Sequence, residues 1–407
     1  MKVLRMVTLH DASIRAKLGV LVALMSIPII VLLVIQYQAR HADVTLAQRE
    51  SHGLTYVNAI VPVIQEVQNH RNLTTAVANG NAAAKPALAA STQAVERDLA
   101  ALNAVDGKYG KAFGTSTLIA FVNDEWTRVK ADTAGSIDTV SFGSHSQLID
   151  DGLLPLVTQA GEASQLFLDS NASGIRSIGP LTETTLEYAE ALSTLQGYAI
   201  GVATSRQGQP VTDFESTFMQ NQQSQATSSS DTLTRRLQTA MTNNPALEAR
   251  MRPLLLGTQA ASLSFFASLG GGIINATAIN VSGDAISAEG QVGVDSALKV
   301  YTSATAPLVP EFQDRISSAR YDLFLEIGIA LAGVVIALLL SGIVARSVTG
   351  PMAHLADVAD RMSLGELDVD IDITSKNEIG QLAESLRRMQ ASLRSAIERL
   401  RVRRAAA

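Results

Sequence analysis

The residue types that carry most enzyme and metal chemistry are sparse in this 407-residue sequence. There is no cysteine, which excludes disulfides, thiolate metal sites and cysteine nucleophiles. The six histidines are scattered, and no two of them stand four residues apart, so no local zinc-ligand pattern exists. No nucleophile–base set and no paired carboxylates in an apolar setting can be recognised. We therefore expect no enzyme, no catalytic residues, no metal site and no cofactor.

Two groups of charged residues remain as candidates for binding chemistry. One is the set of Asp368, Asp370 and Asp372, which occupy every second position of the chain. Three carboxylates could bind a cation, although we expect these to face water. Arg71 stands in a weakly charged stretch and needs an acceptor, for which a bidentate oxyanion is well shaped. The alternative is an ion pair with Glu66 or another carboxylate.

Arg71 is the best single candidate for a ligand contact, and Gln68 precedes it by about one helical turn. Trp126 is the only tryptophan, and it fits either a core position or a ligand-stacking position. These three residues form the predicted ligand site.

Composition indicates long helices rather than a globular enzyme core. Hydrophobic residues make up 47% of the chain but aromatic residues only 4%, which suits helices packed through small side chains. The net charge of -6 is modest, so we expect no nucleic-acid partner.

Two apolar segments are long enough to cross a bilayer. Leu18 to Ile35 has no charge, and Leu323 to Ala345 carries only Glu326 near one end. A cleaved signal peptide is the alternative for the first segment, but the sequence after it has no small-residue cleavage pattern. Basic residues lie at the predicted inner side of both segments: Lys2, Arg5, Arg15, Lys17 and Arg346. Both ends of the chain are therefore expected in the cytoplasm.

The segment between the two spans is helical by pattern, because it shows no sustained alternation and no hairpin signal. The expected helices are Ala39 to Ala78, Ala87 to Val105 (stopping at Asp106-Gly107), Thr115 to Ala134, His145 to Asp169, Thr182 to Thr204, Val211 to Thr242, Ala246 to Leu269 and Asp284 to Arg320. So many helices suit two stacked bundles or one elongated bundle. Gln220 to Asp231 fits a linker or a solvated helix face equally well.

After the second span, two amphipathic helices flank an acidic connector. The first carries a heptad-like seam of Val348, Met352, Leu355, Ala359 and Met362, and the second one of Ile379, Leu382, Leu386, Met389, Leu393 and Ala396. Gly365 is placed to cap the first helix. We expect the connector to be extended and to direct its apolar residues onto the helices. One helix pair leaves its core half covered, so a homodimer is predicted.

The stretch from Val63 to Thr74 resembles the first helix of periplasmic sensor domains in chemoreceptor-like proteins, the nitrate- and nitrite-sensing type among them. Gln68, Arg71 and Leu73 match that motif, while Asn72 replaces its glycine. Gln196 stands where relatives often have an arginine, which weakens any transfer of anion binding.

The segment after the second span resembles the HAMP domain of bacterial sensor kinases and chemoreceptors. Pro351 follows the membrane, and Asn377-Glu378-Ile379-Gly380 precedes the second heptad where the family usually has Asp-Glu-Ile-Gly. The resemblance implies that Pro351 marks entry to the first helix and that Glu378 locks the second helix against it. The predicted coupling residues are Pro351, Leu355, Gly365, Glu378, Leu382 and Leu386.

These observations predict an all-α membrane sensor. Its predicted parts are a cytoplasmic tail (1–17), a transmembrane helix (18–37), a periplasmic helical sensor domain (38–321), a second transmembrane helix (322–345), a HAMP domain (346–398) and a basic tail (399–407). The resemblance implies a bacterial inner membrane. No output domain is recognised, so we expect a receptor subunit that relays a signal to a separate chemoreceptor or kinase.

Two other hypotheses remain open. One is a structural or competitive adaptor that forms mixed dimers with full-length receptors. The other is a remnant of a longer chemoreceptor, sensor kinase or cyclase. The expected partners are a second copy of the chain, membrane lipid, which the basic tail could also touch, a cytoplasmic signalling protein and an unknown small periplasmic ligand.

Overall fold

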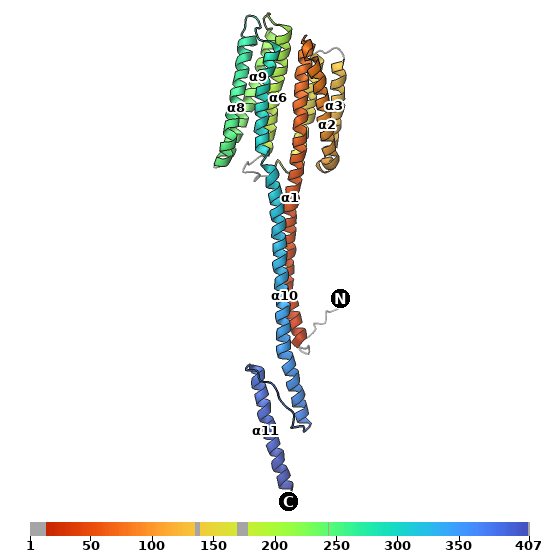
Figure 1. Ribbon diagram of the computed structural model, residues 1–407, viewed down its shortest axis with the longest axis vertical. Helices are drawn as coiled ribbons and strands as arrows, with labels where there is room; N and C mark the ends of the chain where they lie inside the picture. Colours follow the sequence, from red (N-terminus) through yellow and green to blue (C-terminus); the bar gives the residue numbers. More distant parts are fainter. Residues whose placement is uncertain (1–13, 135–138, 169–177, 243, 406–407) are drawn as a thin grey trace, which may run out of the picture. The chain divides into compact units, whose positions relative to one another are not determined.

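The computed structural model describes residues 14–134, 139–168, 178–242 and 244–405, and within them it is helical without a β-strand (Figure 1). The helices are α1 (Ile14–Ala78), α2 (Lys85–Phe113), α3 (Ser116–Ala134), α4 (Thr139–Gln147), α5 (Leu154–Ala163), α6 (Ile178–Ser205), α7 (Asp213–Met241), α8 (Pro245–Leu269), α9 (Gly283–Thr305), α10 (Leu308–Ser363) and α11 (Glu378–Ala405). A short 3-10 helix (Ala82–Ala84) and two π-helical segments (Leu148–Leu153 and Gly270–Ile274) complete the described elements. The predicted all-α class is confirmed.

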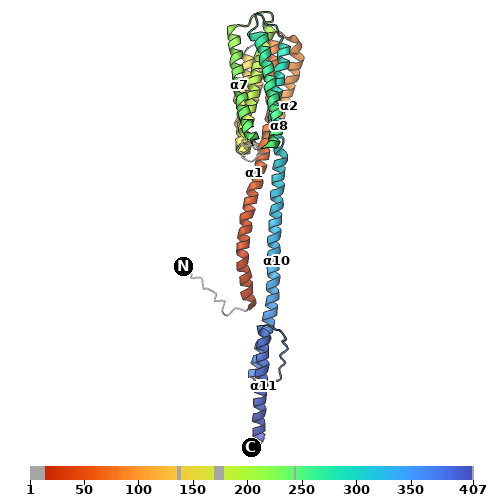
Figure 2. The same cartoon turned by 90° about the vertical axis from the view of Figure 1, so that its left-hand side faces the viewer.

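The chain divides into two compact units, of which Ala42–Ala319 is the helical-bundle unit. Within it, α6 packs against α7 and α9, and α8 packs against the same two helices. The bundle part of α1, with α2 to α5, forms a second group beside the first rather than above or below it (Figures 1 and 2). One hydrophobic core runs through both groups. Of the two arrangements left open by the sequence, a single bundle with one core is therefore found rather than two stacked bundles.

The predicted end of α2 at Asp106-Gly107 is wrong. The helix continues to Phe113 and ends at Gly114, whose φ of 69° suits a glycine. Asp106 is held within the helix because Tyr56 Oη and Thr115 Oγ1 each donate to its Oδ1 at 2.6 Å. Tertiary hydrogen bonds therefore override the local turn signal.

Two further helices differ from expectation, and one open alternative is decided. The helix predicted from His145 to Asp169 begins earlier, passes through a π-helical segment and ends at Ala163. The one predicted from Asp284 to Arg320 is interrupted between Thr305 and Leu308, next to Pro307, which lacks a backbone donor. Gln220 to Asp231 lies inside α7, so it is a solvated helix face rather than a linker.

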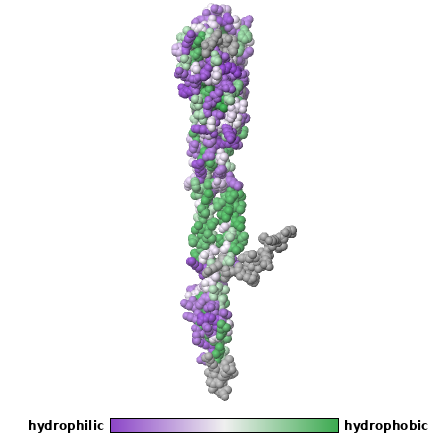
Figure 3. All heavy atoms as spheres, turned by 90° about the vertical axis from the view of Figure 1, so that its right-hand side faces the viewer, coloured by the Kyte–Doolittle hydropathy of each residue, from purple (hydrophilic) through white to green (hydrophobic). Residues whose placement is uncertain are grey.

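The second unit contains the described residues of Met1–His41 together with Arg320–Ala407. Within the described chain, three helical stretches are long and apolar enough to cross a membrane: Gly19–Ala78, Pro245–Ile274 and Gly283–Ser363. The most apolar windows of the first and third contain no buried residue, and Figure 3 shows the hydrophobic surface that they form. The stretch containing α8 instead buries one face in the bundle core.

At one end of these apolar windows, Arg40 of α1 pairs across to α10. Its Nη2 donates to Glu326 Oε1 at 3.2 Å and approaches Asp322 Oδ2 at 3.5 Å. The predicted inner charges Lys2 and Arg5 lie outside the described residues, as does Asp169.

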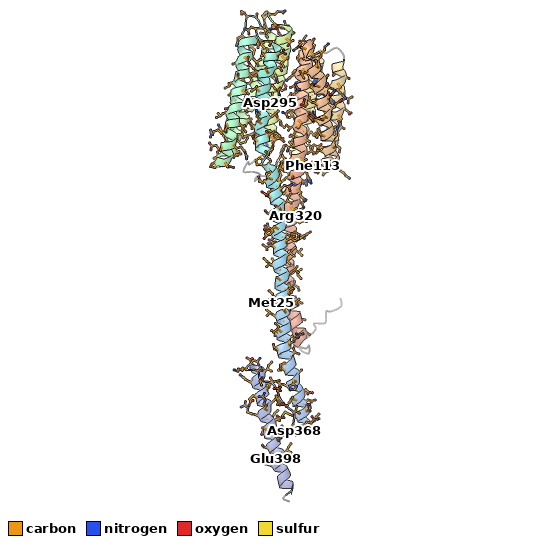
Figure 4. The ribbon with its side chains drawn as sticks, in the orientation of Figure 1. Met25, Phe113, Asp295, Arg320, Asp368 and Glu398 are labelled. Atoms are coloured by element: carbon orange, nitrogen blue, oxygen red, sulfur yellow. The ribbon has the colours of Figure 1, made fainter. Side chains whose placement is uncertain are left out.

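The end of α10, the connector (residues 364–377) and α11 share a small hydrophobic core. The buried members are Leu355, Val358, Met362, Val369, Ile371, Ile373, Ile379 and Ala383. The connector is extended, as predicted, with alternate side chains turned inward. Its aspartates are exposed, and Asp368 (labelled in Figure 4) pairs with Arg394.

Candidate functional site

The structure places Arg71 in the interior of the helical-bundle unit, with no exposed side-chain surface. Its guanidinium is paired with Glu190 of α6 in a bidentate arrangement, Nη1 to Oε1 at 2.6 Å and Nη2 to Oε2 at 3.3 Å. Burial of an unpaired guanidinium would be very unfavourable, so the carboxylate is what permits it there. The acceptor is therefore Glu190 and not Glu66.

This pair and the polar side chains bonded to it form a cluster that is buried except for the half-buried Ser146, called here the core network (Gln68, Arg71, Ser146, Glu190 and Ser193). Arg71 donates to Ser146 Oγ at 3.0 Å and to Ser193 Oγ at 3.1 Å. Gln68 Nε2 donates to Glu190 Oε2 at 2.8 Å. Gln68 and Arg71, two of the predicted ligand residues, are thus brought together, but both donate to the carboxylate of Glu190 in the same chain. Two buried atoms, Gln68 Oε1 and Arg71 Nε, have no partner among the described residues.

The ring of Trp126 contacts His70, which is one of a pair of neighbouring histidines. Its indole packs edge-on against the His70 ring, with centroids 5.1 Å apart. His70 Nδ1 lies 2.7 Å from His145 Nε2, and burial lowers the pKa of His70 to about 4. The indole is 3% exposed, as expected for a core residue. Whether these residues bind a ligand stays a prediction.

The two departures from the sensor-domain motif are hydrogen-bonded to each other. Asn72 Nδ2 donates to Gln196 Oε1 at 2.9 Å, and Gln196 Nε2 donates to the carbonyl of Ser287 at 2.7 Å. An uncharged amide pair therefore occupies the positions where the resembled proteins have a glycine and often an arginine. With Arg71 balanced by Glu190, this region holds no excess positive charge for an inorganic anion.

In the second unit, local chemistry fixes the ends of the two helices that carry the predicted coupling residues. Gly365 follows α10 with a φ of 96°, a conformation that favours glycine. Asn377 precedes α11 and accepts from the backbone N–H of Gly380 at 3.3 Å, so it replaces the usual aspartate as the cap. A Cβ at Gly380 would collide with the carbonyl oxygen of Ser375, so only glycine lets the connector approach.

Two residues that the sequence reasoning missed attach the connector to α11. Arg387 donates to the carbonyl oxygen of Ile371 at 3.1 Å and also to that of Ile373. Gln390 donates to the carbonyl oxygens of Leu367 at 3.0 Å and Val369 at 2.7 Å. These polar residues lie just off the heptad seam, and no sequence signal distinguished them from solvated positions.

The predicted coupling residues occupy different environments in the single chain. Leu355 is 2% exposed, and Leu386 packs at the edge of the same core. Leu382 is 43% exposed, like its seam neighbours Met389 at 48% and Leu393 at 41%. These three share one face of α11, and we call them the exposed seam. An uncovered leucine seam is what a second helix pair would cover.

The remaining two coupling candidates lie in or at the start of helices. Pro351 is half-buried within α10, which continues through it without a break. Glu378 is the first residue of α11 and is exposed, and its side chain has no hydrogen bond or ion pair to any residue in the described chain. The roles of both in coupling stay predictions.

Comparison with known proteins finds one family model that matches within this second unit. Residues 343–395 match the family model of the HAMP domain. The chain is 36% identical to the methyl-accepting chemotaxis protein McpA of Bacillus subtilis over 80 residues, and 40% identical to TlpB of the same organism over 91 residues. It is also 34% identical over 93 residues to a sensory transducer protein of Acetivibrio thermocellus.

These alignments cover a limited part of each protein. They take in 20%, 22% and 23% of this chain, and 12%, 13% and 16% of McpA, TlpB and the Acetivibrio protein. No solved structure matches the chain. The comparisons confirm the predicted HAMP domain and the likeness to chemotaxis transducers.

Proposed function

Because this chain carries a HAMP domain and is similar to chemotaxis transducers, we propose that it is a transmembrane receptor subunit. In this proposal the helical-bundle unit lies in the periplasm of a bacterium and binds a signal there. Both termini are cytoplasmic, and the HAMP domain passes a packing change to a separate signalling protein. The chain has no assigned catalytic role in this process.

The continuity of α10 is the observation that carries the proposal. Its first turns bury Leu308 and Phe312 in the core of the helical-bundle unit. The same helix then provides an apolar span and buries Leu355 and Met362 in the HAMP core. An unbroken helix transmits displacement or rotation along its length, which is the input that a two-state helical module requires.

The exposed seam supports a homodimer. Leu382, Met389 and Leu393 leave about half of each large side chain in water. A second copy anchored in the same membrane would bring the same face into a parallel bundle, which removes that surface from water.

The absence of native cysteine makes disulfide cross-linking a direct test. A Leu382→Cys variant in native membranes should form dimers under mild oxidation. The matched control is Ala391→Cys, also exposed but roughly two and a half turns further along, on the opposite face of α11. Equal cross-linking at both positions would contradict the dimer packing.

The relay is tested in the same variant. Glu190→Gln disturbs the core network without touching the HAMP domain and should change the Leu382→Cys cross-linking rate by roughly fivefold, the lower end of common allosteric couplings. If neither this variant nor any other in the helical-bundle unit alters the rate, the relay is wrong.

A further inference from the structure

A pocket of about 530 Å³ opens in the helical-bundle unit between the last turns of α1, α4, the end of α6 and the start of α7. Figures 1 and 2 label three of these helices, α1, α6 and α7. Its lining residues are Thr74, Thr75, Ala78, Asn79, Phe142, Gly143, Tyr198, Gly201, Val202, Ser205, Glu215 and Phe218. The volume falls within the usual range for small-molecule sites.

Three of the twelve residues that line this pocket are aromatic. The rings of Tyr198 and Phe218 lie with centroids 4.1 Å apart, and both are half-buried. Phe142 provides a third half-buried ring. At Gly201 the helices α6 and α1 approach closely, since a Cβ there would lie 2.9 Å from Thr75 Cγ2. In a chain with only 4% aromatic residues, three rings around one hollow indicate a site for a flat apolar group.

The polar groups of the pocket specify the charge of that ligand. None of the lining residues is a lysine, arginine or histidine. The one carboxylate, Glu215, is engaged by Arg206 Nε at 2.6 Å and by the backbone N–H of Thr212 at 2.9 Å. An anionic ligand would therefore be repelled by the Glu215 carboxylate and would find no positively charged lining residue to bind. A cation would find the carboxylate already paired.

Lining residues of the pocket can still form hydrogen bonds with an uncharged group. Asn79 Nδ2 donates to the carbonyl of Thr75 at 2.8 Å, which leaves the side-chain oxygen of Asn79 as an acceptor. Burial, followed by the nearby Glu215, raises the pKa of Tyr198, so its hydroxyl stays protonated and can donate. The pocket thus offers both an acceptor and a donor beside the rings.

We propose that this pocket binds a small uncharged aromatic molecule bearing a hydrogen-bonding group such as an amide or hydroxyl. The further claim that this ligand is the signal of the receptor rests on the proposed function. Phe142 links the pocket to the core network, because the Arg71 guanidinium lies 5.1 Å from the centroid of its ring. Thr75 Oγ1 also donates to the carbonyl of Arg71 at 2.9 Å. Occupation of the pocket therefore acts on α1, the helix that also provides the first span.

Binding of benzamide, benzoate and benzamidine to the full chain in lipid nanodiscs tests the ligand class. These probes share one ring and differ in charge, and empty nanodiscs correct for partition into lipid. Benzamide should bind saturably with a dissociation constant on the order of 1 mM, as expected for a fragment. Benzoate and benzamidine should each bind at least about tenfold more weakly. Tighter binding of either charged probe would overturn the uncharged assignment.

Two variants test the location. Phe218→Ala removes one wall and should weaken benzamide binding by at least about tenfold. Its matched control is Phe214→Ala on the same helix, an aromatic that is 74% exposed and does not line the pocket. Ala78→Trp adds bulk from an exposed lining position and should abolish binding without emptying the core. Benzamide binding that survives Phe218→Ala and Ala78→Trp would refute the site.

Occupancy and signalling are measured separately. If benzamide binds but leaves Leu382→Cys cross-linking unchanged, the site stands and its role as a signal is refuted. If benzamide does not bind while variants in the helical-bundle unit still alter cross-linking, the site is refuted and the relay stands.

Discussion

Removal of the charge on Glu190 should destabilise the helical-bundle unit through the arginine left behind. Glu190→Gln keeps the side-chain size but removes the carboxylate that is hydrogen-bonded to the fully buried Arg71. Breaking one side of a buried ion pair costs about 3–5 kcal/mol. Arg71 would keep its bonds to Ser146 and Ser193, so we expect the lower end, roughly 3 kcal/mol.

Arg71→Met completes a double-mutant cycle. Alone, it leaves the Glu190 carboxylate buried, although Gln68 still donates to it, and roughly 3 kcal/mol is again expected. The double variant leaves neither charge unpaired. Its cost should therefore fall below the sum of the two single costs by about 2–3 kcal/mol.

Urea unfolding followed by the emission of Trp126 measures these costs. Trp126 is the only tryptophan, is buried and contacts His70 beside the core network, so its spectrum reports on this unit. The control is Arg252→Met in the exposed pair with Glu248, which should change the unfolding free energy by no more than about 0.5 kcal/mol. Additive costs within roughly 0.5 kcal/mol would refute the pairing of Arg71 with Glu190.

Four other perturbations give expectations of different kinds. Burial lowers the pKa of His70 to about 4 in the folded chain. As the pH falls from about 6.5 to about 4, the unfolded chain therefore protonates this histidine before the folded chain does. Up to roughly 3 kcal/mol of the free energy of unfolding should be lost in that window. His70→Gln should show a smaller loss in the same titration, and identical pH profiles would contradict this. Gly107→Ala should stabilise α2 by about 0.5–1 kcal/mol because a Cβ there meets nothing within 4 Å. Gly197→Ala should instead cost about 1–3 kcal/mol, because its Cβ would collide with Asn72 Oδ1 and would also lie 3.0 Å from Phe142 Cε2. If urea unfolding showed that both glycine variants change the free energy of unfolding in the same direction, both assignments would be contradicted. Gly380→Ala should release the connector from α11, so that trypsin cleaves after Lys376 at least about tenfold faster. The control is Gly350→Ala, which should leave the cleavage rate unchanged because a Cβ there meets nothing within 4 Å.

Features set by strong local patterns could be predicted from the sequence. The apolar windows, the cap at Gly365 and the alternating connector follow from composition and period, and the structure shows each of them. The end of α2 could not be predicted in this way. Asp106 followed by Gly107 is a turn signal, and the hydrogen bonds that Asp106 accepts from Tyr56 and Thr115 explain why the helix continues.

The candidate site shows the same division. Arg71 stood out because a lone guanidinium in an apolar helix needs an acceptor. Its partner could not be identified, because Glu190 lies 119 residues away and no local spacing connects them. The hydrogen bond between Asn72 and Gln196 was hidden for the same reason, although each had been noted separately as a departure from the motif.

The alternating connector has a consequence for its permitted length. Val369, Ile371 and Ile373 face the helices, while Asp370 and Asp372 face solvent. Inserting or deleting one residue would exchange these two sets and turn carboxylates toward the apolar core. A change of two residues preserves the pattern. Connector variants that keep the apolar core intact should therefore differ from the present connector by an even number of residues.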